Sequence, residues 1–126
     1  MVTHTVITRA AAVIAVAIVS VSLALQANAH AKLESTTPKA KATVSSPQLI
    51  QVHFNEAIEA KLSSLKLLGS DGKMISIMSM NDAKDPTTLS IMPNATLAPG
   101  VYKAIWNIVS DDGHKATGSF SFTVKK

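Results

Sequence analysis

The sequence predicts an all-β fold, a seven-stranded Greek-key β-sandwich of the immunoglobulin-like or cupredoxin-like kind. Residues 50–54 and 120–124 alternate apolar and polar side chains, with the period of two that half-buried strands require. Turn-forming residues separate the apolar segments at spacings of about ten residues, which is typical of short antiparallel strands in a sandwich. No segment after residue 30 has the longer period of a convincing amphipathic helix.

The N-terminal segment, residues 1–29, is predicted to be a cleaved secretory signal peptide. Arg9 precedes an apolar stretch, residues 10–25, that is shorter than the roughly 20 residues a membrane-spanning helix needs. Ala27 and Ala29 supply the small side chains that a signal peptidase requires. An uncleaved membrane anchor is the alternative. Cleavage after Ala29 leaves residues 30–126, which we expect to be one soluble, monomeric domain in the periplasm.

The expected strands follow one another along this domain. They are residues 32–34, 50–55, 64–68, 73–80, 87–92, 101–109 and 119–124. Gly69 and Gly72 mark a turn that is expected to close a hairpin between the third and fourth of these segments. Residues 101–109 are apolar at both parities, as in a central strand, and the short segment 56–61 is the one helical candidate.

Two large aromatic residues, Tyr102 and Trp106, share a parity on the expected central strand. We therefore expect both side chains to anchor the core between the two sheets.

Composition excludes several classes of chemistry. The chain has no cysteine, so it has no disulfide, no zinc–thiolate site and no thiol nucleophile. Its 12 basic and 8 acidic residues form no run of like charge, so nucleic acid is not an expected partner. A metal ion would have to be held by histidine, carboxylate, methionine or the chain terminus.

Three histidines remain after the predicted cleavage, and His30 becomes the first residue. Its free α-amine and its Nδ1 atom can then close a chelate ring around one ion. Such a two-nitrogen chelate suits Cu(II), which favours nitrogen and oxygen donors in a square-planar or tetragonal arrangement.

Asp112 and His114 form a second candidate pair, because residues two apart in an extended segment face the same side. The alternative is a polar turn between strands, with an exposed histidine. His53 lies by parity on the polar face of its strand and is expected to be a solvated sheet histidine. Glu56 follows where the alternation ends, and its orientation is left open.

Together these segments resemble the CopC-type periplasmic copper-binding and copper-resistance proteins. The resemblance begins at the exposed segment 30–33 and continues through Thr37-Pro38 and residues 53–56. It is strongest in residues 106–114, with Gly118 and Phe120 beyond.

The resemblance implies a Cu(II) site at one end of the sandwich. Its ligands would be the α-amine and imidazole of His30, the carboxylate of Asp112 and the imidazole of His114, with Glu56 as a weak or outer ligand. The implied function is to buffer copper, confer resistance, or deliver copper to an inner-membrane transport protein, without catalysis. The alternatives are a metal-free immunoglobulin-like structural module and a copper-dependent oxidative enzyme.

Some members of that family also carry a Cu(I) site in a methionine-rich loop that contains a histidine. This chain has Met74, Met78, Met80 and Met92 in the corresponding region, but no histidine there. Three of these methionines share a strand parity, so packing against the core is the favoured interpretation.

Overall fold

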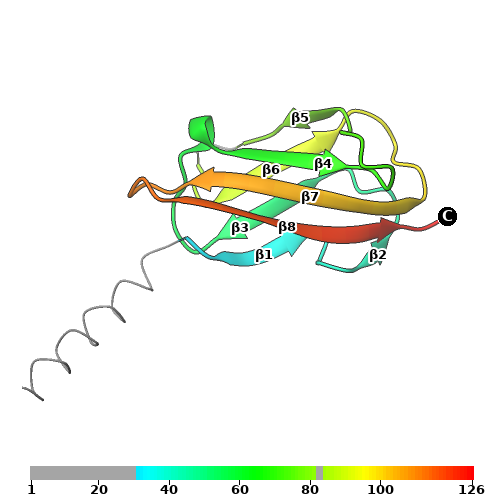
Figure 1. Cartoon of the computed structure of the whole chain (residues 1–126), viewed down its shortest axis with the longest axis horizontal. Helices are drawn as coiled ribbons and strands as arrows, with labels where there is room; N and C mark the ends of the chain where they lie inside the picture. The colour runs from blue at the N-terminus through cyan, green and yellow to red at the C-terminus, as the bar shows by residue number, and fades with distance from the viewer. Residues whose placement is uncertain (1–30, 82–83) are drawn as a thin grey trace, which may run out of the picture. The chain divides into compact units, whose positions relative to one another are not determined.

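The computed structural model describes residues 31–81 and 84–126 (Figure 1). The predicted signal peptide and His30 lie outside the described residues. Residues 31–126 form one compact unit. Its strands are β1 (Leu33–Thr37), β2 (Thr43–Val44), β3 (Ile50–Phe54), β4 (Ser64–Leu68), β5 (Ile77–Ser79), β6 (Thr88–Pro93), β7 (Gly100–Val109) and β8 (Lys115–Val124), with a 3-10 helix, η1 (Ala60–Leu62), between β3 and β4.

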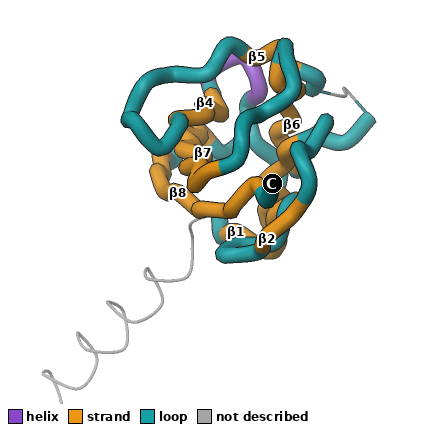
Figure 2. Tube along the Cα trace, turned by 90° about the vertical axis from the view of Figure 1, so that its right-hand side faces the viewer, coloured by secondary structure: helices purple, strands orange, loops and turns teal. Residues whose placement is uncertain are grey.

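The strands form two four-stranded sheets that pack as a β-sandwich, as the sequence predicted. One sheet has the order β1-β3-β6-β5 and the other has the order β2-β8-β7-β4. Figure 2 views the sandwich from the end at which the C-terminus lies. Every strand pair is antiparallel except the short parallel pair of β2 and β8. The strand that the sequence did not predict is β2, whose two residues are too few to display an alternation.

The predicted hairpin of residues 64–68 and 73–80 is wrong. The turn at Gly69 and Gly72 does form, and Leu68 and Met74 make an isolated bridge beyond it. The chain then crosses to the other sheet, where β5 pairs with β6 while β4 stays paired with β7. A turn signal fixes the local reversal of the chain, but it does not fix the sheet in which the next strand pairs.

The core contains the aromatic residues that the sequence assigned to it. Tyr102 stacks on Phe122, with ring centroids 5.7 Å apart, and Trp106 meets Phe54 edge to face at 6.0 Å. β7 occupies a central position in its sheet, but its burial alternates, and Val101 is 52% exposed. The apolar residues at both parities therefore reflect a strand that is buried on one face only.

Gly118 of β8 is paired with Trp106 of β7. A Cβ atom at Gly118 would overlap the indole ring of Trp106. The ring lies across the β8 backbone at this point, so the absence of a side chain at residue 118 is what allows Trp106 to enter the core.

The predicted helical segment, residues 56–61, is mostly irregular, and only η1 at its end is helical. Nowhere in residues 31–81 or 84–126 is there a helix long and apolar enough to cross a membrane.

Candidate metal site

The turn between β7 and β8 carries two of the predicted ligands. Val109 and Lys115 are the last paired residues of this long hairpin. The N–H of Ser110 donates to the carbonyl of His114 at 2.9 Å, and the N–H of Gly113 donates back to the carbonyl of Ser110 at 2.9 Å. Gly113 has a φ of 85°, a left-handed conformation that glycine adopts without strain. Asp112 and His114 are thus held in a tight turn on two ten-residue strands.

The Asp112 carboxylate is fixed by three groups. Its Oδ2 atom lies 2.9 Å from Nδ1 of His114. Its Oδ1 atom accepts a short hydrogen bond from the hydroxyl of Ser110 and a longer one, 3.3 Å, from the N–H of His114. These bonds, chiefly the one from Ser110, lower the pKa of Asp112 from 3.8 to about 2. The carboxylate is therefore anionic at neutral pH.

Asp112 and His114 do contact each other, as their spacing suggested, but not because they lie in an extended segment. The sequence predicted that Asp112 and His114 face each other because they lie in an extended segment, yet both lie outside the strands, in the β7–β8 turn. The polar inter-strand turn that was the alternative is the geometry that forms. The two side chains meet because the turn folds them together.

The segment that carries Glu56 lies against this turn. Ala57 accepts a hydrogen bond from the N–H of Asp111 at 3.1 Å, and Ile58 bridges to Ser110. On the other side of Glu56, the Asn55 N–H donates to the carbonyl of Lys32 at 2.9 Å, and the Asn55 side chain accepts from the N–H of Lys32 at 2.7 Å. Residue 56 therefore stands between the β7–β8 turn and the start of the described chain.

Glu56 itself has an unsatisfied oxygen. Its side chain is half-buried, and Oε1 is fully buried without a hydrogen-bond partner among the described residues. A buried acceptor without a partner is costly, so such an atom commonly accepts a donor or binds a cation.

The fourth predicted ligand, His30, precedes the described residues. Within residues 31–81 and 84–126, no three histidine, aspartate or glutamate side chains are grouped closely enough to hold a metal ion by themselves. The N–H of Lys32 is hydrogen-bonded to the side chain of Asn55, the residue before Glu56. In the sequence, His30 precedes Lys32 by two residues.

His53 belongs to a different cluster, on the outer face of the β1-β3-β6-β5 sheet. Its Nδ1 lies 2.8 Å from the hydroxyl of Thr88, and its Nε2 lies 3.3 Å from a carboxylate oxygen of Glu34. Asp85 lies nearby along a shallow polar depression of about 220 Å³ that His53 also lines. The side chain is 40% exposed, which confirms the expected position on the polar face. The sequence did not reveal the contact with Glu34, because that contact depends on the register of β1 against β3.

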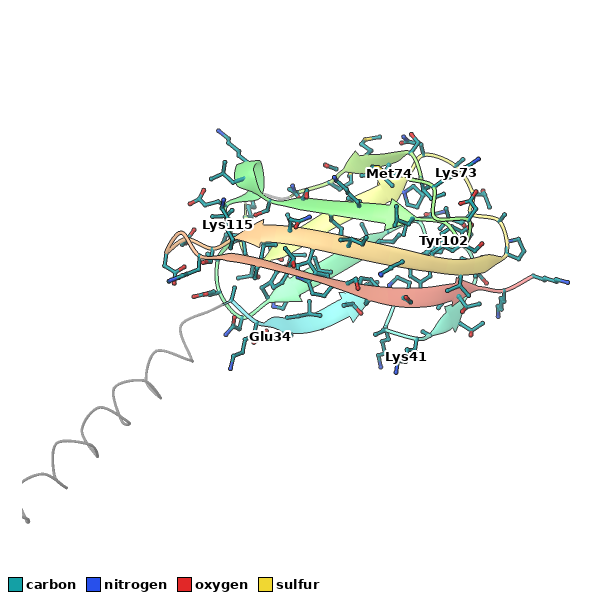
Figure 3. The ribbon with its side chains drawn as sticks, in the orientation of Figure 1. Glu34, Lys41, Lys73, Met74, Tyr102 and Lys115 are labelled. Carbon is teal, nitrogen blue, oxygen red and sulfur yellow. The ribbon has the colours of Figure 1, made fainter. Side chains whose placement is uncertain are left out.

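The methionines do not pack in the core, contrary to the favoured interpretation of the sequence. Met74, Met78 and Met80 are 64%, 55% and 44% exposed. Met78 lies on the edge strand β5, directly across from Met92 of β6. Met74 lies toward the end of the sandwich opposite Lys115, which follows His114 (Figure 3).

Comparison with known proteins gives a consistent match. A profile of the CopC domain matches residues 33–125. Copper resistance protein C of Escherichia coli is 35% identical over 106 residues, which cover 79% of this chain and 84% of that protein.

Solved structures agree with this match. The crystal structure of CopC from Methylosinus trichosporium OB3b superposes with a TM-score of 0.71 at 33% identity, covering 76% of this chain and 94% of that one. The crystal structure of PcoC, a methionine-rich copper resistance protein from Escherichia coli, superposes with a TM-score of 0.69 at 35% identity. That match covers 77% of this chain and 100% of PcoC.

Proposed function

The chain belongs to the CopC domain family, and from this premise we propose that it is an exported protein that holds Cu(II) outside the cytoplasm. Its relative in Escherichia coli is named for copper resistance. The metal is the cargo of such a protein, which keeps the ion bound until it is passed to a recipient. We propose that the recipient is an inner-membrane copper transport protein.

The proposed ligands are the α-amine and imidazole of His30, the carboxylate of Asp112 and the imidazole of His114. One observation carries this assignment: the Asp112–His114 pair is anchored by a hydroxyl of the core, with its carboxylate held anionic. Nitrogen and carboxylate donors without thiolate suit Cu(II), which also stands highest in the affinity order of the divalent first-row ions. Both members of this pair would be ligands, the carboxylate supplying an oxygen donor and the imidazole a nitrogen donor.

Glu56 is proposed to complete the site from the side. Its Oε1 atom is buried and lacks a partner among the described residues, and its segment is bonded both to Lys32 and to the β7–β8 turn. We assign it to the bound cation or to a donor of the N-terminal residue, where its negative charge stabilises the charged site.

We propose a carrier without catalytic activity. All five aromatic side chains of the chain are buried in the core, so none is exposed to stack against a polysaccharide substrate. This favours the carrier over the alternative of a copper-dependent oxidative enzyme. The immunoglobulin-like structural module that binds no metal is the remaining alternative, and a binding measurement separates it from the carrier.

The deciding experiment changes the N-terminus. A chain that begins at His30 is compared with one that begins with an added glycine before His30, by competition titration with Cu(II). The added residue converts the α-amine into a peptide nitrogen and leaves every side chain in place. We expect Cu(II) affinity to fall by orders of magnitude, because one strong nitrogen donor becomes far less basic.

Two controls accompany this comparison. The metal-free proteins should have the same thermal midpoint, since the added residue touches no core position. His30→Ala with the native terminus keeps the amine and loses the imidazole, and it should also weaken binding. If the chain with the added glycine bound Cu(II) as tightly as the chain that begins at His30, the proposed N-terminal ligands would be wrong.

A second candidate function is a Cu(I) site at the edge strand β5. It is favoured by the exposed thioethers of Met74, Met78 and Met80, and by the direct pairing of Met78 with Met92. Thioether sulfur is a ligand that Cu(I) prefers.

A further inference from the structure

The outer face of the β2-β8-β7-β4 sheet is basic and carries no acidic side chain. None of the four strands contains an aspartate or a glutamate, whereas β1 of the other sheet carries Glu34. The exposed lysines on these strands are Lys66 of β4, Lys103 of β7 and Lys115 of β8. The remaining outward side chains of β4, β7 and β8 are hydroxyl, amide or aliphatic groups. We call this surface the lysine face; β4, β7 and β8 run side by side across the view in Figure 1.

Two of these lysines lie close together and are not neutralised. Lys66 of β4 is paired with Ile105 of β7. Lys103 also lies on β7, two residues before Ile105, so Lys66 and Lys103 are diagonal neighbours across the two strands. Within the described residues, neither Lys66 nor Lys103 forms an ion pair. The two ammonium groups repel each other weakly across the adjacent strands, and an external anion would offset that repulsion.

A shallow depression of about 230 Å³ lies on this face between β7 and β8. It is lined by Lys103, Ile105, Thr117, Gly118 and Ser119. One ammonium group and two hydroxyls therefore border the same hollow, and these are donors that suit a phosphate group.

Further lysines extend the charge at one end of the lysine face. The alternation of β8 continues to Lys125, which is exposed and whose N–H bonds to Val44 of β2. Lys41 is exposed beside the same strand, with its N–H bonded to the carbonyl of Ser121. Acidic residues flank these strands in the connecting loops, with Asp71 after β4 and Asp111 and Asp112 in the β7–β8 turn.

We propose that the lysine face docks on the surface of a membrane that contains anionic phospholipids. The residue types favour a lipid surface over a protein partner. Protein interfaces draw their energy from buried aromatic side chains and arginine. This face has neither, because the five aromatic residues are in the core and Arg9 is the one arginine of the chain. Lysines spread over the outer face of a sheet instead suit a diffuse layer of phosphate groups.

The test uses metal-free protein that begins at His30, because residues 31–126 contain all eight strands and the whole described core. Sedimentation with vesicles of phosphatidylcholine is compared with sedimentation with vesicles that also contain phosphatidylglycerol. We expect binding to the anionic vesicles only, and a loss of that binding as salt is raised. Absence of binding to the anionic vesicles at low salt would overturn the proposal.

A pair of double variants then separates the lysine face from net charge. Each lysine near an anionic surface contributes about a fivefold factor in partitioning, so Lys66→Gln with Lys103→Gln should weaken binding about 25-fold. Lys61→Gln with Lys73→Gln removes the same charge from η1 and a loop outside the sheet, and it should change binding much less. Equal losses in the two double variants would show attraction by net charge alone and would contradict a docking face.

Both double variants should keep the thermal midpoint and the Cu(II) affinity of the parent, because all four lysines are exposed and none is a proposed ligand. The vesicle measurement contains no copper, so its failure leaves the copper proposal intact. Binding to an immobilised acidic protein but not to anionic vesicles would overturn the proposal of membrane docking and assign the lysine face to a protein partner.

Discussion

The hydroxyl of Ser110 connects the core of the sandwich to the candidate site. Ser110 is 1% exposed, yet its Oγ atom donates to the exposed carboxylate of Asp112 and also lies 3.2 Å from the carbonyl of His114. A buried donor of this kind fixes one orientation of the carboxylate and keeps it anionic. The Asp112 carboxylate is therefore held in one orientation by the protein itself.

This geometry predicts different roles for two adjacent aspartates. Asp112→Ala should lower Cu(II) affinity at least tenfold and change the d–d absorption of the complex, because it removes an oxygen ligand. Asp111→Ala should change both little, since the contact that places Asp111 is made by its backbone N–H with Ala57. Calorimetric titration and visible spectroscopy of the two variants make the comparison. Equal effects would mean that the carboxylate ligand is misassigned.

At the level of single residues, the sequence was informative wherever the function of a side chain depends on its near neighbours. Asp112 and His114 are two residues apart, so their proximity was predicted even though the local conformation was not. Glu34 and His53 are far apart in the chain, and their contact arises from the β1–β3 register with its irregularity between Leu33 and Ser35. Such a contact has no local signal in the sequence.

Among the elements, the β7–β8 hairpin contains a position, Gly118, at which the packing leaves no room for a side chain. Gly118→Ala should destabilise the protein by about 1–3 kcal/mol, because the added methyl overlaps the Trp106 indole and the core must shift to admit it. Chemical denaturation of the metal-free protein measures this change. Ser119→Ala, one residue along at an exposed position, is the matched control and should stay within about 0.5 kcal/mol of the parent.

The edge strand β5 supports a prediction about Cu(I). Under reducing conditions, Met78→Leu with Met92→Leu should weaken Cu(I) binding, measured by competition with a chromogenic Cu(I) chelator, and leave Cu(II) binding at the opposite end unchanged. Leu62→Met adds a thioether at an exposed position in η1, outside β5 and β6, and should not restore binding. If Cu(I) affinity is unaffected in the double variant, the methionines at this edge serve no metal.

Strand existence could be predicted from alternation, and strand partners could not. The segments that became β3, β4, β6 and β7 were expected to within one residue of their observed bounds, whereas β8 begins four residues before its expected start. The partner of β4 was missed because a turn of three or four residues serves equally well within one sheet or between two sheets. The exposure of the methionines was missed for a different reason. A shared parity shows that side chains lie on one face of a strand, but it does not show whether that face is buried.

For the molecule as a whole, pH separates the two kinds of proposed ligand. Because the pKa of Asp112 is lowered to about 2, this carboxylate stays ionised down to pH values well below those at which imidazole and amine nitrogens take up protons. Cu(II) affinity should therefore fall steeply between about pH 7 and about pH 4.5 through protonation of the nitrogens alone.

Asp112→Asn provides the control for this pH dependence. It should bind Cu(II) more weakly at every pH in that range but with the same slope of affinity against pH, because the lost carboxylate does not titrate there. A flat affinity profile for the parent protein would contradict nitrogen ligation, and a shallower slope for the variant would show that Asp112 contributes protons to the exchange.

The placement of the long and short strands has a consequence for self-association. The two ten-residue strands, β7 and β8, pair with each other along their whole length, but β2 covers β8 only at Thr123 and Val124. The edges are β2 with two residues, β5 with three, β4 with five, and β1 with five and an irregular register. Short or irregular edges give another chain few free backbone groups to pair with. On the β2 side, however, residues 115–120 of β8 have no neighbouring strand among the described residues, so this segment leaves more backbone open to another chain than any of the short edges does.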